Sequence, residues 1–99
     1  MKAYMHLIMY ALSKKCVVSV WDGGEWAEER SKDYYKIVDA IKSVDESQLK
    51  IHDPDDCYMG WAMIIPSLDD DETVADCSDN KFMNEWSALY EEQLPEVLF

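Results

Sequence analysis

The chain is predicted to fold as a single α+β domain over residues 1–99, with an antiparallel sheet of about four strands packed against two or three helices in the order α-ββ-α-ββ-α. Short runs rich in valine and isoleucine alternate with longer segments of helical periodicity, and turn-forming residues separate them. Hydrophobic residues make up 48% of the chain, which is enough to form a core. A chain of 99 residues is too short to form two.

The first element is predicted to be a helix over residues 2–14. This segment has no Gly or Pro and ends at Lys14 and Lys15, whose charges favour a helix C-terminus. A strand remains the alternative, because the apolar residues fit neither period cleanly. A hairpin follows, with strands over 16–21 and 25–30 joined by Asp22-Gly23-Gly24.

A second helix is predicted to start after Ser31, which can cap it, and to end near Val44. Its inward stripe has the spacing i, i+3, i+4 and i+7, formed by Tyr34, Ile37, Val38 and Ile41. A strand over 48–52 comes next, and Asp53-Pro54-Asp55-Asp56 has the composition of a turn.

The apolar run over 57–65 is the longest in the chain and is predicted to be the central, most buried strand. Within it, Gly60 indicates a bulge or a close backbone approach. Val74 and Ala75 fit a short edge strand, and a last helix is expected over 80–93, stopped by Pro95.

The four tryptophans are expected to divide into two groups. Trp61, in the apolar run, and Trp86, on the apolar stripe of the last helix, are predicted to lie in the core. Trp21 and Trp26 flank the hairpin turn and are predicted to pair across it. For Trp21 and Trp26 a position in the core is still favoured over an exposed one. If either ring is exposed, it is expected to anchor a partner protein.

The net charge of −12 comes from the second half of the chain. Residues 1–50 hold eight acids and eight Lys or Arg, whereas residues 51–99 hold thirteen acids and one base, Lys81. So much negative charge repels phosphate and anionic lipid, which argues against direct binding of nucleic acid or of a membrane surface. A positively charged protein is the expected partner.

Three cysteines without a C-x-x-C pair fit a reducing compartment, so a cytoplasmic location is expected. The apolar start from Ala3 to Leu12 resembles a signal peptide, but His6 interrupts it and no small-x-small cleavage site follows.

Carboxylates held at several places on a fold can imitate the charge of a nucleic-acid strand, since duplex DNA carries a charge about every 1.7 Å along its axis. The acids of the second half are therefore predicted to share one face and to bind the partner. They are Asp53, Asp55, Asp56, Asp69, Asp70, Asp71, Glu72, Asp76, Asp79 and Glu85. The alternative for each acidic run is a solvated loop that keeps the chain soluble.

No metal, cofactor or catalytic group is predicted. Asp76-x-Ser78-x-Asn80 resembles the start of an EF-hand loop, but Lys81 stands where glycine is required. A cysteine paired with His6 or His52 would make a nucleophile and base, yet no spacing signature supports that pair. The chain is therefore expected not to be an enzyme.

Several segments resemble small acidic accessory proteins of phages and prophages: Ser19-Val20-Trp21-Asp22-Gly23-Gly24-Glu25-Trp26, Ser31-Lys32-Asp33-Tyr34, Gly60-Trp61-Ala62, Ala75-Asp76 and the late aromatic helix. The resemblance covers most of the chain and carries no active site over to it. It implies a protein that disables a host factor and is located in the host cytoplasm.

The expected function is thus non-enzymatic: inhibition of a host nucleic-acid-binding or defence protein by an acidic face that mimics nucleic acid. The alternative is a small structural or assembly protein that forms a homodimer through aromatic surface, with the acids serving solubility only.

Overall fold

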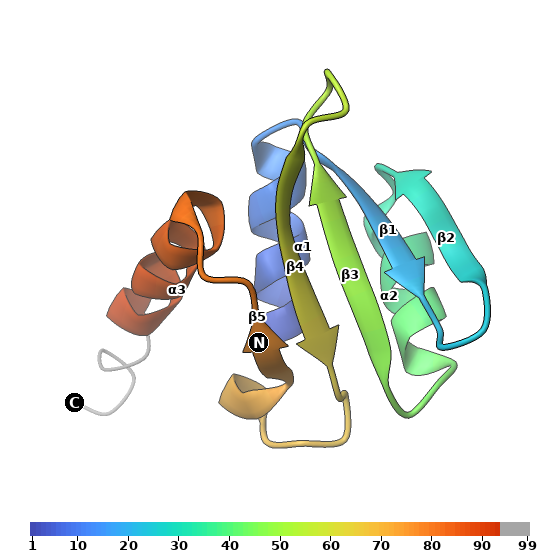
Figure 1. Cartoon of the computed structure of the whole chain (residues 1–99). Helices are drawn as coiled ribbons and strands as arrows, with labels where there is room; N and C mark the ends of the chain where they lie inside the picture. The colour runs from blue at the N-terminus through green and yellow to red at the C-terminus, as the bar shows by residue number, and fades with distance from the viewer. Residues whose placement is uncertain (94–99) are drawn as a thin grey trace.

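The computed structural model describes residues 1–93 and has an α+β fold (Figure 1). In chain order the elements are α1 (Ala3–Ser13), β1 (Val17–Trp21), β2 (Trp26–Ser31), α2 (Tyr34–Lys42), β3 (Ser47–His52), β4 (Tyr58–Ile64), the 3-10 turn η1 (Asp70–Glu72), β5 (Val74–Cys77) and α3 (Lys81–Gln93). The first segment is a helix, so the strand alternative is excluded. The predicted stop at Pro95 lies outside the described residues.

The sheet has five antiparallel strands in the order β2-β1-β3-β4-β5, rather than the predicted four or so. The fifth strand is β5, which has four residues and pairs with β4 at the edge of the sheet. It confirms the short edge strand expected at Val74 and Ala75, which the predicted order did not count. The central strand is β3 and not the 57–65 run, which forms β4 beside it. Apolar run length therefore did not predict the position of this strand in the sheet.

The core lies between one face of the sheet and the helices. Every second strand residue points toward α1, α2 and α3, and those buried there are Val18, Val20, Leu49, Ile51, Ala62 and Ile64. The helices contribute Tyr4, Leu7, Ile8, Ile37, Ile41, Met83 and Trp86. No helix of the described chain has the length and hydropathy needed to span a bilayer.

The opposite face of the sheet, here called the uncovered face, has no helix packed on it in the described chain (Figure 1). Trp61 lies on this face and is only half-buried, because it alternates with the buried Gly60 and Ala62. The prediction that Trp61 is a core residue was therefore wrong. Trp86 is buried, at 4% exposed, as predicted.

Two local contacts shape the elements. The side chain of Asp33, rather than that of Ser31, caps α2, because its carboxylate accepts hydrogen bonds from the amides of Tyr35 and Lys36. Gly60 is a point of close approach, since a Cβ there would lie 2.6 Å from Cγ of Met83 in α3. A register shift in the pairing of β3 with β4 also adjoins Gly60.

Candidate functional site

Antiparallel pairing brings three loops to the same end of the sheet, at the bottom of Figure 1. Trp21 pairs with both Trp26 and Gln48, so the β1–β2 turn lies beside the start of β3. Ser47 pairs with Ile64, and Ile64 with Val74, which adds the β4–β5 connection. Loops 22–25, 43–46 and 65–73 therefore meet at one end.

We call this region the acidic end, because its three loops contain eight carboxylates and no Lys or Arg. The acids are Asp22, Glu25, Asp45, Glu46, Asp69, Asp70, Asp71 and Glu72. Seven of them are exposed, and Asp22 is half-buried. Carboxylates in this arrangement present a negative surface to an approaching partner.

The segment 69–72 is fixed to the N-terminus of α1 by the buried Thr73. The Thr73 hydroxyl accepts a hydrogen bond from the amide of Tyr4 at 3.2 Å and donates one to the carbonyl of Asp70 at 3.1 Å. The Tyr4 amide is one of the helix N–H groups without an intrahelical acceptor. The positive end of the helix dipole also stabilises carboxylates placed near it. This acidic run is therefore held on the fold.

The β1–β2 turn is ordered by Asp22, whose Oδ1 accepts from the amides of Glu25 at 2.8 Å and Gly24 at 2.9 Å. These two hydrogen bonds hold the pKa of the Asp22 carboxyl below its ordinary value. Gly23 has a φ of +104°, a conformation that side-chain-bearing residues rarely adopt. The turn thus fixes the direction in which Glu25 leaves the sheet.

Little positive charge compensates these acids. Residues 1–93 contain two ion pairs, Arg30–Asp56 and Lys81–Glu85, and neither involves the acidic end. Lys2 approaches loop 65–73 but donates its hydrogen bond to the carbonyl of Pro66, at 2.9 Å. The negative charge of the acidic end also acts on Tyr90 in α3. Burial raises the pKa of Tyr90, and the charges of Asp71 and Asp70 raise it further.

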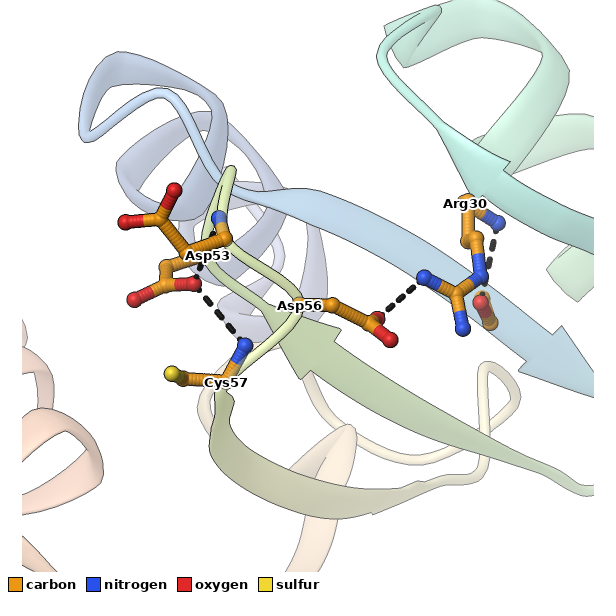
Figure 2. A network of polar contacts seen from close by, with 6 residues as sticks. Arg30, Asp53, Asp56 and Cys57 are labelled. Carbon is orange, nitrogen blue, oxygen red and sulfur yellow. Dashed lines mark hydrogen bonds and ion pairs between the residues drawn. The ribbon is translucent and has the colours of Figure 1, made fainter.

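The turn 53–56 lies at the other end of the sheet, where Val17 and His52 pair (Figure 1). Asp53 accepts from the amides of Asp55 and Cys57, both at 2.9 Å, and Asp56 forms an ion pair with Arg30 (Figure 2). That hydrogen bond to Arg30 is the main cause of the lowered pKa of Asp56. Two of these acids thus have local structural partners.

Lysines are mixed with the remaining acids at this second end. A shallow hollow there is lined by Asp53 and Glu85 together with Lys14 and Lys81. Asp79 accepts a hydrogen bond from the amide side chain of Asn84 at 2.9 Å. This end therefore carries both signs of charge.

The ten predicted binding residues are consequently divided between the two ends. Asp69, Asp70, Asp71 and Glu72 belong to the acidic end, whereas Asp53, Asp55, Asp56, Asp79 and Glu85 lie at the opposite, mixed-charge end. Asp76, which pairs with Met63, points to the uncovered face between them. The prediction that these acids share one face was therefore wrong, because the fold sends the turn 53–56 and the loop 65–73 to opposite ends of the sheet.

Four acids of the acidic end were not predicted from the sequence: Asp22, Glu25, Asp45 and Glu46. Each pair is too short to be conspicuous as a charge run, and all four lie in the electrically neutral first half. The signal that finds them is strand direction, because alternate loops of an antiparallel sheet meet at the same end.

Other kinds of site find less support in the geometry. Within residues 1–93, no three His, Cys, Asp or Glu residues are arranged to hold a metal ion. His6 accepts a hydrogen bond on Nδ1 from the indole of Trp86 and makes an edge contact with Tyr90, so it packs α1 against α3. Cys16 is buried, and burial is the first cause of its raised pKa.

Comparison with known proteins gives no relative: no family model, no curated protein and no solved structure matches this chain significantly. The acidic end is therefore interpreted from its own geometry and charge.

Proposed function

We propose that this chain is a binding protein, without catalysis of its own, that uses the acidic end to occupy a positively charged surface of another protein. The observation that supports the proposal most is the convergence of eight carboxylates on three neighbouring loops that contain no Lys or Arg. Collected charge of one sign attracts an oppositely charged partner over a distance and speeds the encounter.

The spacing of the charges favours mimicry of nucleic acid as the mode of binding. Five strands about 4.8 Å apart give this end of the sheet a span of roughly 19 Å from edge strand to edge strand. Duplex DNA carries about 11 charges in that length. Eight carboxylates over the same span are of similar density, so a protein with a DNA- or RNA-binding groove is the partner we propose.

A narrower form of the proposal is a phage-type inhibitor of a host nucleic-acid-binding or defence protein. It rests on the resemblance of the hairpin, second-helix and Trp61 segments to phage accessory proteins. The test below treats this identity as an outcome of partner identification.

The test is retention of host proteins on the immobilised full chain at low salt, followed by competition with duplex DNA and identification of what is released. The informative variant carries Asp69→Asn, Asp70→Asn, Asp71→Asn and Glu72→Gln. A matched control removes the same charge elsewhere, through Glu29→Gln, Asp39→Asn, Asp55→Asn and Glu85→Gln, all at exposed positions.

We expect a nucleic-acid-binding protein to be retained by the wild-type chain and the control, to be displaced by DNA, and to be lost by the acidic-end variant. Equal retention by the two variants would contradict the proposal, because net charge alone would then explain binding.

A homodimer is the second candidate function, and one observation favours it. Helix α1 contains no charged residue and exposes Met9, which lines an apolar hollow of about 500 Å³ with Met1, Leu12, Tyr34 and Tyr35. Contiguous apolar surface of this kind is typical of protein contacts. Light scattering on the wild-type chain and on Met9→Glu tests it: a dimer that the substitution dissociates supports this candidate, and a wild-type monomer rejects it.

A further inference from the structure

A hollow of about 190 Å³ lies where the acidic end meets the uncovered face of the sheet. Its lining comes from β1, the β1–β2 turn, the loop 43–46, the start of β3 and the end of β4. The residues are Trp21, Gly23, Glu46, Ser47, Gln48 and Met63. Sites for small-molecule ligands usually exceed about 300 Å³. The size of this hollow suits a single side chain of a partner.

The hollow is built from a row of side chains that crosses the sheet. Direct pairing connects Trp26 to Trp21, Trp21 to Gln48, Gln48 to Met63 and Met63 to Asp76, so the five residues lie side by side on the uncovered face. One end of the row is aromatic and the other is acidic. The row borders the acidic end along its whole length.

Contacts within the protein hold the walls of the hollow in place. Trp21 meets Trp26 edge to face, with ring centroids 5.1 Å apart and an angle of 72° between the planes. Oε1 of Gln48 accepts a hydrogen bond from the indole N–H of Trp61 at 3.2 Å. The site is thus ordered before a partner arrives, which lowers the entropic cost of binding.

We propose that this hollow receives an arginine side chain of the partner, an inference that rests on the proposed function. The planar guanidinium stacks on the Trp21 ring and donates hydrogen bonds to the carboxylate of Glu46. Arginine suits this combination better than lysine, because its flat, weakly hydrated cation both stacks and forms paired hydrogen bonds.

An interaction inside the protein illustrates the affinity of this face for cations. Nζ of Lys50 lies 5.6 Å from the centroid of the Trp26 ring, a cation–π distance. Trp26 is therefore already occupied by a cation, and Trp21 is the neighbouring ring that borders the hollow.

Charge complementarity selects a cationic occupant over the other candidates. A second copy of the chain would bring another net charge of −12, and a nucleic acid would bring phosphates beside the eight carboxylates of the acidic end. Both approaches are repulsive, whereas an arginine on a basic protein is attracted by the same charges.

The experiment titrates nona-arginine, with nona-lysine in parallel, into the full chain and measures affinity by calorimetry at low salt. Glu46→Gln is compared with Glu25→Gln, since both glutamates are exposed and belong to the acidic end, but only Glu46 lines the hollow. We expect Glu46→Gln to weaken nona-arginine binding about fivefold more than Glu25→Gln. Trp21→Leu is expected to cost about fivefold.

Indole N–H signals in NMR spectra of the wild-type chain give a second measurement that does not depend on a variant's folding. Nona-arginine is expected to shift the Trp21 signal most and to leave the buried Trp86 unchanged. A larger shift of Trp26 or Trp61 than of Trp21, equal losses in the two glutamate variants, or equal affinity for nona-lysine overturns the arginine site while leaving the proposed function intact. Failure of the wild-type chain to bind either peptide contradicts both.

Discussion

Thr73→Val removes the hydroxyl that fixes the acidic segment to α1 and leaves the shape of the side chain nearly unchanged. The hydroxyl is fully buried, accepts from the Tyr4 amide and donates to the Asp70 carbonyl. Leaving the amide without an acceptor costs about 1–3 kcal/mol, and the lost bond to Asp70 about 0.5–1.5 kcal/mol more. We therefore expect the free energy of unfolding to fall by about 1.5–4.5 kcal/mol, and Tm by roughly 6 °C or more.

Equilibrium unfolding in urea measures this loss, and amide hydrogen exchange at Tyr4 measures the broken contact. Thr73→Ser is the matched control, because it keeps the hydroxyl and removes one buried methyl group, at a cost of about 1 kcal/mol. The reasoning is refuted if Thr73→Val is within about 0.5 kcal/mol of wild type, or if the Tyr4 amide keeps its protection in that variant.

Three further outcomes are expected. Gly60→Ala should lower the free energy of unfolding by about 1–3 kcal/mol in urea melts, because the new methyl group would overlap Met83; an unchanged midpoint would exclude that contact. An aromatic disulfide reagent should modify the exposed Cys57 first and the buried Cys16 last, since burial raises the pKa of the Cys16 thiol; the reverse order contradicts the packing. The lowered pKa of Asp22 stabilises the fold above its ordinary pKa, and that contribution is lost as pH falls through the folded-state value. Asp22→Asn should therefore make the free energy of unfolding less dependent on pH below about 4, which urea unfolding at a series of acidic pH values will measure. The same pH dependence in the variant and in wild type would contradict the stabilising role of the Asp22 carboxylate.

Element types were well predicted from the sequence where local signals agreed. The stripe from Tyr34 to Ile41 formed α2, and Asp22-Gly23-Gly24 formed the turn of a hairpin. The cap of α2 was misassigned because Ser31 and Asp33 are both good capping residues, and only the position of the first helical turn decides between them.

Tertiary relations were predicted less well. The strand β5 is only four residues long, and so short a segment shows too little alternation of apolar and polar residues. It was therefore left out of the predicted number of strands. Trp61 lies in a run apolar on both sides of the strand, and that pattern does not reveal that one face of the sheet carries no helix. Strand order, which places β3 at the centre, depends on pairing between distant residues.

The candidate site shows the same division. The run 69–72 was selected from the sequence and does belong to the acidic end. Asp45 and Glu46 were not selected, because they lie next to the run 69–72 only when β3 pairs with β4. Asp53 and Asp56 were selected for their charge, but both have local structural roles. Asp53 stabilises a turn through its hydrogen bond with the Cys57 amide, and Asp56 forms an ion pair with Arg30. Sequence composition recorded how many acids there are, and topology decided which of them meet.

The most direct test of the account is the salt dependence of affinity for the basic partner recovered on the immobilised chain. It is measured for wild type, for the variant neutralised at residues 69–72 and for the matched control variant, from about 50 mM to about 500 mM salt. We predict that wild type and control weaken together with rising salt, while the acidic-end variant binds at least about tenfold more weakly at low salt and with a shallower slope. Identical affinities and slopes for the two variants would contradict the claim that the acidic end is the binding surface.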